Sequence, residues 1–306
     1  MSGRMKIGFV LPTGDGEAGD GSPGYPLIRS LALGAEAAGL DSIWVADHLL
    51  MRFPGEPESG VHEAWTILAA LAEATSRVEL GTIVLCSSFR NPGLVAKMAA
   101  TLDDVSGGRV VLGIGCGWHD PEYEAFGYPT DHKVGRFAEA LAILDGLLAG
   151  ERVTYHGTFH DAEDAVLLPP PAREIPILVA AVKPRMLELT ARHADAWNTA
   201  WYSLPDERRA TRTAGLDAAL VAAGRDPASL VRTVGVRMRP AGAPDEPPVG
   251  PGALFRGDAT ELAALLDTYA GLGFDHLLAW VDPTDLAGLD WFVEGVGIHR
   301  GHRPGG

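Results

Sequence analysis

Short apolar, β-branched runs alternate with longer helical patterns along the whole chain. The run 110–114 is continuously apolar, as expected for a strand buried on both faces of a parallel sheet. The segment 94–105 has apolar residues at helical spacing, and Ser106-Gly107-Gly108 supplies the chemistry of a helix C-terminus. A β-branched run at 78–86 precedes that helix, so the pattern predicts one parallel strand–helix–strand unit.

This alternation occurs eight times. We predict strands at 6–11, 42–47, 78–86, 110–114, 176–180, 196–199, 231–238 and 276–281. The helices that follow them are predicted at 25–38, 63–75, 92–105, 133–149, 184–193, 205–223, 258–272 and 285–296. Eight such repeats in about 300 residues predict a single (β/α)8 (TIM) barrel domain over residues 1–306. A doubly wound parallel sheet is the alternative.

Three insertions interrupt the repeat after predicted strands 2, 4 and 7. They comprise residues 49–62, 150–174 and 239–257, and are rich in proline, glycine or charged residues. The second contains VTYHGTFH, which predicts a β-hairpin. The first and third leave the carboxyl ends of strands, where they would act either as active-site lids or as variable linkers.

Composition narrows the choice of partners. The chain has 306 residues, 46% of them hydrophobic, and a formal net charge of −15. That charge argues against nucleic acid and anionic membranes as partners, because both require basic patches, but a local cluster or backbone N–H groups could still bind an anionic ligand. The partner we expect is a small-molecule substrate. No uncharged stretch approaches the roughly 20 residues that span a bilayer. The two cysteines cannot build a disulfide framework, so we expect a cytoplasmic protein.

The first candidate site follows predicted strand 2, where Asp47 and His48 stand together. In barrels of this kind the active site lies at the carboxyl ends of the strands. His48 could transfer a proton near neutral pH, and Asp47 could accept hydrogen bonds from a ligand. The alternative is structural: Asp47 caps the loop and His48 packs beneath it.

A glycine-rich turn, Gly115-Cys116-Gly117-Trp118, follows predicted strand 4. Small residues there let a flat ligand approach the backbone closely. The turn is not a dinucleotide-binding fingerprint, because Trp118 and the two residues after it fill the place of the last glycine. Trp118 either walls a planar ligand or plugs the barrel mouth. Glu122, a little further on, is consistent with an ordinary helix-terminus carboxylate.

Predicted strand 5 ends at Ala180 and Ala181, and the next helix begins at Pro184. Lys183 and Arg185 flank that helix N-terminus, where free backbone N–H groups and the helix dipole favour an anion. This predicts phosphate binding, with an ordinary helix start and two solvated cations as the alternative.

A catalytic metal is not expected. His156 and His160 have the four-residue spacing of helical ligands, but Gly157 and Thr158 between them indicate a hairpin turn. The chain also lacks a GxSxG nucleophile elbow and a Walker loop.

Taken together, these segments resemble the bacterial luciferase-like monooxygenase superfamily, whose fold is a (β/α)8 barrel. The likeness covers nearly the whole chain and is carried, in order, by SIWVADH, LGTIVL, FRNP…AKMAATLD, SGGRVVLGIGCGW…EYEAFG and PILVAA…RHADAWN. Members use either reduced FMN with oxygen or the deazaflavin coenzyme F420. The Asp-His pair, GTIVL and Ala-Ala resemble the deazaflavin branch.

The resemblance implies roles for individual residues. Asp47 would lie near the deazaflavin ring, His48 would face the reaction centre as the catalytic acid or base, and a cis peptide bond would join Ile83 to Val84. The implied coenzyme-binding set is Asp47, Ile83, Val84, Cys86, Gly115, Cys116, Gly117, Ala180, Ala181, Val182 and Lys183. Trp118 and Trp280 would shape the substrate pocket.

The chain departs from the resemblance at two places. Val182 and Lys183 stand where relatives often carry glycines, and Trp118 stands where sugar-phosphate dehydrogenases of this branch carry a glutamate. A sugar-phosphate substrate is therefore not expected. The resemblance implies an oxidoreductase, often dimeric, that moves a hydride between F420 and a small organic substrate. An FMN-dependent monooxygenase and a non-catalytic coenzyme-binding protein are the alternatives.

Overall fold

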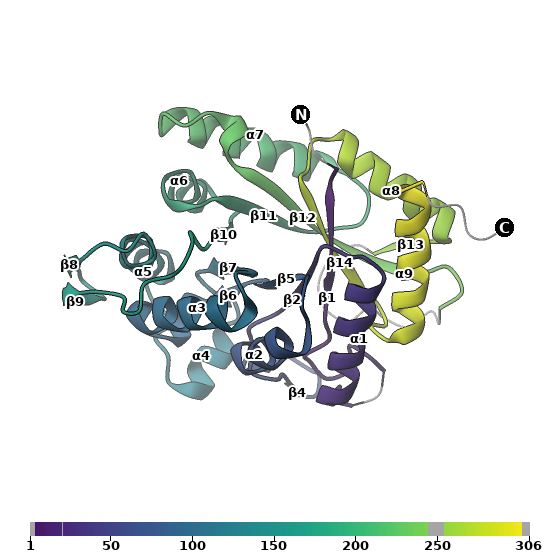
Figure 1. Cartoon of the computed structure of the whole chain (residues 1–306), viewed down its shortest axis with the longest axis horizontal. Helices are drawn as coiled ribbons and strands as arrows, with labels where there is room; N and C mark the ends of the chain where they lie inside the picture. Colours follow the sequence, from purple (N-terminus) through teal and green to yellow (C-terminus); the bar gives the residue numbers. More distant parts are fainter. Residues whose placement is uncertain (1–3, 20, 244–253, 302–306) are drawn as a thin grey trace.

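A closed parallel barrel forms the centre of the molecule in the computed structural model, which describes residues 4–19, 21–243 and 254–301 (Figure 1). The strands pair in the order β10-β11-β12-β14-β1-β2-β5-β7, and β7 pairs with β10 to close the ring. The predicted barrel is thus confirmed. Its strands are β1 (Lys6–Val10), β2 (Ser42–Val45), β5 (Glu79–Thr82), β7 (Val110–Gly115), β10 (Ile177–Ala180), β11 (Ala196–Tyr202), β12 (Val231–Pro240) and β14 (His276–Val281).

Helices surround the strands and bury one face each against them (Figure 1). Sequence-local caps fix several of their starts: Asn91 caps α3 through the Gly93 N–H, and Asp258 and Glu261 form a capping box on α8. The helices are α1 (Tyr25–Ala37), α2 (Ala64–Ala74), α3 (Pro92–Ser106), α4 (Asp120–Phe126), α5 (Lys133–Leu148), α6 (Pro184–His193), α7 (Glu207–Ala222), α8 (Ala259–Gly271) and α9 (Leu286–His299).

The predicted third strand is divided into two. β5 ends at Thr82, and a short strand β6 (Leu85–Cys86) resumes after a two-residue bulge at Ile83 and Val84. Both β5 and β6 pair with β7, so the chain keeps its direction across the bulge. The bulge does not end the sheet, and its two side chains pack against a buried cluster that contains Val10 and Leu178.

The insertions take defined forms where the structure describes them. After β2 comes a hairpin of β3 (Leu50–Met51) and β4 (Ser59–Gly60), and VTYHGTFH lies in a hairpin of β8 (Val153–His156) and β9 (Asp161–Ala165). The second hairpin connects α5 to β10, so this insertion precedes the amino end of β10. In the third insertion, β13 (Phe255–Gly257) pairs with β12. Most of the 239–257 loop, residues 244–253, lies outside the described residues.

A buried polar chain lies inside the barrel near its amino end. The Trp44 Nε1–H donates to Ser42 Oγ at 2.7 Å, and Ser42 Oγ lies 2.8 Å from His276 Nε2. Because an indole can only donate, the Ser42 hydroxyl hydrogen is available to His276, which then carries its own proton on Nδ1. Burial lowers the pKa of His276 to about 3, helped by the nearby charge of Lys6. The barrel therefore holds this histidine neutral.

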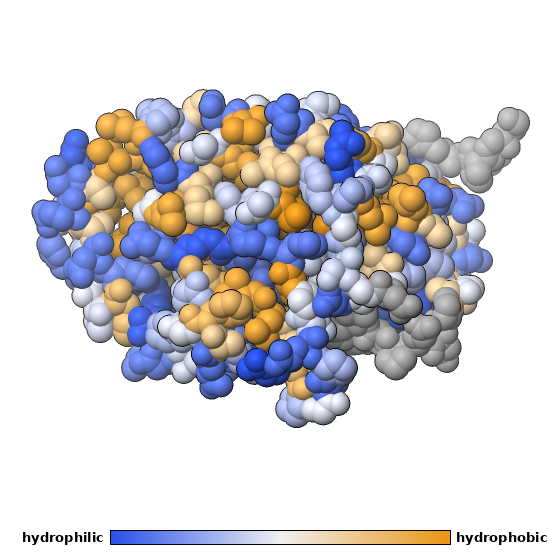
Figure 2. All heavy atoms as spheres, turned by 90° about the horizontal axis from the view of Figure 1, so that it is seen from below, coloured by the Kyte–Doolittle hydropathy of each residue, from blue (hydrophilic) through white to orange (hydrophobic). Residues whose placement is uncertain are grey.

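The outer surface of the helices is mixed in polarity. On the face seen from below, near α2, α3 and α4, apolar residues gather in separate patches divided by strips of charged ones (Figure 2). Leu94 and Val105, both on α3, are about half exposed. Within the described ranges, the helices are all too short or too polar to cross a membrane.

Candidate active site

The predicted site segments meet at one end of the barrel. β2 leads into Asp47 and His48, β6 ends at Cys86, β7 ends at Gly115, and β10 ends at Ala180. β2 neighbours β5, and β7 pairs with β5, β6 and β10, so these four carboxyl ends are adjacent around the ring. This is the end at which barrels of this type carry their active sites.

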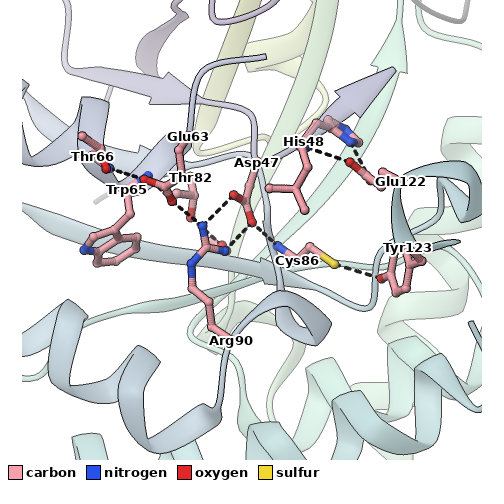
Figure 3. Close-up of polar contacts among 12 residues, drawn as sticks. Asp47, His48, Glu63, Trp65, Thr66, Thr82, Cys86, Arg90, Glu122 and Tyr123 are labelled. Carbon is pink, nitrogen blue, oxygen red and sulfur yellow. Dashed lines mark hydrogen bonds and ion pairs between the residues drawn. The ribbon is translucent and has the colours of Figure 1, made fainter. Parts of the chain in front are cut away.

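Asp47 is buried and is held by neighbouring groups of the protein (Figure 3). Its Oδ2 accepts from the Cys86 N–H and from Arg90 Nη1, both at 2.8 Å, and its Oδ1 accepts from Arg90 Nη2 at 3.0 Å. Arg90 also pairs with Glu63, which caps α2. Burial opposes the charge of Arg90, but the two carboxylates outweigh it and raise its pKa. Asp47 therefore fixes the loop after β6, a geometry that favours positioning over direct contact with a ring.

His48 is held by Glu122, a residue that the sequence indicated only as a helix-terminus carboxylate. His48 Nδ1 lies 3.0 Å from Glu122 Oε1, and the Leu49 N–H donates to Glu122 Oε2 at 2.8 Å (Figure 3). Glu122 is 1% exposed, whereas the His48 side chain keeps partial exposure. With Nδ1–H donated to the carboxylate, Nε2 is the nitrogen left for a ligand, as an acceptor in neutral His48 and a donor when protonated.

An aromatic rim borders His48. The Trp118 ring lies edge-on to His48 at 5.6 Å between centroids, and Phe53 from the β3–β4 hairpin stacks on Trp118 at 6.4 Å. His119 is buried beneath them and accepts the Arg52 N–H through Nε2 at 3.0 Å. Burial lowers the pKa of His119, which suits this acceptor role. Trp118 is 55% exposed, but its ring is part of this rim and lies against His48 and Phe53.

The bulge after β5 forms an apolar floor. The Ile83–Val84 peptide bond is cis, as the resemblance implied. A Cβ on Gly115 would come within 2.9 Å of Val84 Cγ2, so only glycine lets β7 lie this close to the bulge. Ile83 and Val84 pack in a cluster with Trp280, whose ring lies 5.2 Å from that of Trp201. Trp280 thus belongs to the floor, whereas Trp118 belongs to the rim.

Cys86 is buried and Cys116 is half-buried, and burial raises the pKa of both thiols. Cys86 Sγ lies 2.9 Å from the Tyr123 hydroxyl, and burial raises the pKa of the Cys86 thiol to about 12. Gly117 has a φ of +74°, and a Cβ there would lie 1.8 Å from the Tyr123 oxygen. Burial also raises the pKa of Cys116, against the opposing charges of Lys133 and Lys183. The side chains of Cys86 and Cys116 thus pack behind the turn after β7.

The segment after β10 presents a bare backbone and a cation. The Ala181 side chain is buried and its carbonyl accepts the Trp197 Nε1–H at 2.8 Å, while Val182 and Lys183 are exposed. Lys183 immediately precedes the first residue of α6, and no side chain caps that N-terminus. Arg185, the second cation of the predicted anion site, lies 2.9 Å from Glu188. Anion binding at this helix N-terminus stays a prediction.

Two ionisable groups near the mouth, one half-buried and one buried, were missed from the sequence. Glu17, after β1, accepts the Thr13 N–H at 2.7 Å, and burial raises its pKa although His48 and Arg237 oppose the shift. Arg237, on β12, is fully buried with its guanidinium 5.0 Å from the Trp280 ring centre. Arg237 lies inside a strand pattern, and Glu17 lies in a polar loop, so neither carried a distinguishing signal.

These features fit a flat coenzyme ring with an anionic tail. The ring would find an apolar floor at Ile83 and Val84, which Gly115 backs, and the tail would meet Lys183. The Ser87 hydroxyl, buried just beyond β6, has no hydrogen-bond partner among the described residues and offers a polar contact. The described residues contain no group of three or more histidine, cysteine or acidic side chains that could hold a metal ion.

Comparison with known proteins identifies the family to which the chain belongs. The sequence model of the luciferase-like monooxygenase family matches residues 5–247. Among curated relatives, a phthiodiolone/phenolphthiodiolone dimycocerosates ketoreductase from Mycobacterium sp. (strain JLS) is 35% identical over 74% of this chain and 64% of its own length. An F420-dependent glucose-6-phosphate dehydrogenase from Kineococcus radiotolerans is 30% identical over 82% of this chain and 86% of its own. The chain therefore spans less than two thirds of the ketoreductase.

Solved structures share the fold. An F420-dependent secondary alcohol dehydrogenase in complex with an F420–acetone adduct superposes with a TM-score of 0.80, and the match covers 97% of this chain and 100% of that one at 20% identity. A monooxygenase from Streptomyces bottropensis gives a TM-score of 0.74 at 22% identity, with 97% and 100% coverage. At such identities the likeness establishes the barrel and leaves the chemistry to the site.

Proposed function

The chain belongs to the luciferase-like monooxygenase family, and on that premise we propose that it is an F420-dependent oxidoreductase that moves a hydride between the coenzyme and a small organic substrate. The observation that carries the proposal is the His48–Glu122 pair, which binds His48 through Nδ1 and leaves Nε2 for a proton transfer, at the end of the barrel where β2, β6 and β7 end. The names of the F420-dependent relatives support the choice of coenzyme. One barrel domain carries the activity.

F420, when bound, supplies or accepts the hydride at its ring. Ile83 and Val84, backed by Gly115, would hold the ring, and Ala180–Lys183 would hold the tail. Asp47 acts indirectly, because its bonds to the Cys86 N–H and to Arg90 fix the loop after β6. Orientation of this kind supplies much of the rate in a hydride transfer, whose electronics belong to the coenzyme.

His48 moves the accompanying proton at Nε2. The Glu122 carboxylate holds Nδ1–H, and it stabilises the imidazolium when Nε2 is protonated. In reduction His48 donates this proton to the substrate oxygen, and in oxidation it removes it. A positioned acid or base of this type contributes roughly 10²–10⁴-fold in rate.

Turnover with and without oxygen tests the proposal. The purified protein is mixed with reduced F420 and a panel of ketones and aldehydes under argon, and coenzyme oxidation and alcohol formation are followed. We expect one alcohol per coenzyme, without oxygen, and a loss of at least 10²-fold in His48→Ala with F420 affinity retained. Product formation that requires reduced FMN and oxygen instead would establish the monooxygenase alternative. Tight coenzyme binding with no turnover on any carbonyl would establish the non-catalytic one.

A homodimer and a cytoplasmic location are also part of the proposal. The half-exposed apolar side chains of Leu94 and Val105 on α3 support burial of this face against a second copy. Light scattering on the eluting protein measures the mass directly: about twice the chain mass of 32.3 kDa is expected, and a single-chain mass would refute the dimer.

A further inference from the structure

We propose that the site takes an uncharged substrate with an apolar body, a ketone or the corresponding secondary alcohol, and that Phe53 and Trp118 form the wall against which that body packs. The inference rests on the hydride transfer proposed above and names its substrate class. In the reducing direction, the carbonyl carbon gains a hydride and its oxygen gains the proton of His48. Reduced F420 is oxidised by two electrons in the same step.

The wall lies beside the proposed proton donor. Trp118 is 55% exposed, yet its ring is only 5.6 Å from the His48 ring. Phe53 extends the same surface, with its ring inclined by 25° to that of Trp118. A large aromatic surface left in water costs free energy that a bound apolar body would recover. A substrate whose oxygen reaches His48 would place its adjacent carbons against this surface.

The protein holds the wall in place before any ligand binds. The hairpin that carries Phe53 is tied to the turn that carries Trp118 by the bond from the Arg52 N–H to His119. At its other strand, the Gly60 N–H donates to Asp15 Oδ2 at 2.6 Å, and the Asp15 N–H donates to the Gly60 carbonyl at 3.0 Å. A surface fixed in this way binds without first being ordered, which favours contact with a rigid apolar body.

Charges around the wall do not favour a phosphorylated substrate. Arg52 and Lys133 are the two cations that act on the pKa of His119, and both already pair with carboxylates: Arg52 Nε lies 2.7 Å from Glu58 Oε1, and Lys133 contacts Asp120. The buried carboxylate of Glu122 adds a further negative charge beneath them. A dianionic phosphate held here would meet two neutralised pairs and one carboxylate, whereas an uncharged ketone meets no such repulsion.

Kinetics with two uncharged ketones, cyclohexanone and acetophenone, and with glucose 6-phosphate test this inference on the F420-loaded protein. The variants are Trp118→Ala and Phe53→Ala, and the matched control is Val221→Ala, which removes a 65% exposed apolar side chain from α7. Loss of contact with about 100 Å² of the indole should raise the KM for the ketones roughly 10- to 100-fold in Trp118→Ala. The kcat should change much less, since the ring contacts substrate and transition state alike. Val221→Ala should match the wild type.

F420 titration of every variant distinguishes a failure of the proposed substrate class from a failure of the proposed coenzyme. Unchanged coenzyme affinity with raised ketone KM supports the wall. An unchanged ketone KM in both variants, a higher kcat/KM for glucose 6-phosphate, or no turnover of either ketone by protein that binds F420 would overturn the substrate class and leave the coenzyme assignment standing. A wild-type protein that binds no F420 would instead remove the proposed function itself.

Discussion

The neutral histidine inside the barrel should make the free energy of unfolding sensitive to acid. His276 is 4% exposed and bonds to Ser42, and burial lowers its pKa to about 3 from the ordinary 6.5. Between these two values the unfolded chain carries a proton on this side chain and the folded chain does not. The free energy of unfolding must therefore fall as the pH falls from about 6.5 toward 3.

The size of the effect follows from the two pKa values. Between pH 8 and pH 5, proton uptake by His276 in the unfolded chain should lower the free energy of unfolding by about 2 kcal/mol, and the full shift corresponds to nearly 5 kcal/mol. In His276→Gln this contribution disappears, while the amide can still bond to Ser42. The variant can be less stable at pH 8 because its packing changes. Its stability should nevertheless decline about 2 kcal/mol less than that of the wild type between pH 8 and 5.

Equilibrium urea denaturation at pH 8, 6.5 and 5 supplies the measurement, with circular dichroism and tryptophan fluorescence as independent probes. The control is His156→Gln, which removes an exposed histidine from the β8–β9 hairpin. Parallel declines in wild type and His276→Gln would refute the reasoning, because they would mean that His276 takes up its proton equally in both states.

Three further outcomes follow from the site. Arg90→Leu should destabilise the protein by about 3–5 kcal/mol in urea denaturation, because it leaves the buried Asp47 carboxylate without its cation; a loss below 1 kcal/mol would contradict the pairing. Cys86 should resist iodoacetamide at pH 8 in the native protein and react once urea unfolds it, since its thiol is buried with a pKa of about 12, and rapid native labelling would show otherwise. Gly113→Ala should lower the melting temperature strongly, because its Cβ would lie 1.8 Å from the Thr82 carbonyl oxygen; an unchanged melting temperature would mean that β5 and β7 are not so close.

The barrel was predictable because its strands and helices carry strong periodic signals. The strand at His276–Val281 and the helix at Pro184–His193 agree with prediction at both ends. The division of the third strand into β5 and β6 was visible only through the family resemblance, since Ile83 and Val84 continue a β-branched run like any strand interior. The apolar pattern predicts a strand here, and it does not record where the hydrogen bonding of that strand is interrupted.

The position of the candidate site was predictable, but the residues that pair with Asp47 and His48 were not. Asp47 and His48 were found because they end a strand, but their partners Arg90 and Glu122 lie 43 and 74 positions further along the chain. Such pairings are fixed by the barrel's closure and leave no local spacing to detect. Phe53 was missed for the same reason: it lies in an insertion, and only the hairpin's contact with the turn after β7 places it beside Trp118.

Competitive binding of F420 and FMN decides which coenzyme the protein uses. Coenzyme-free protein is titrated with F420 and with FMN, each oxidised and reduced, and binding is followed by fluorescence. We expect micromolar or tighter binding of F420 and at least tenfold weaker binding of FMN. Gly115→Val should weaken F420 binding, because the added side chain would enter the 2.9 Å approach to Val84. Preferential binding of reduced FMN, with F420 unable to displace it, would rule out F420 as the coenzyme and leave only the barrel standing.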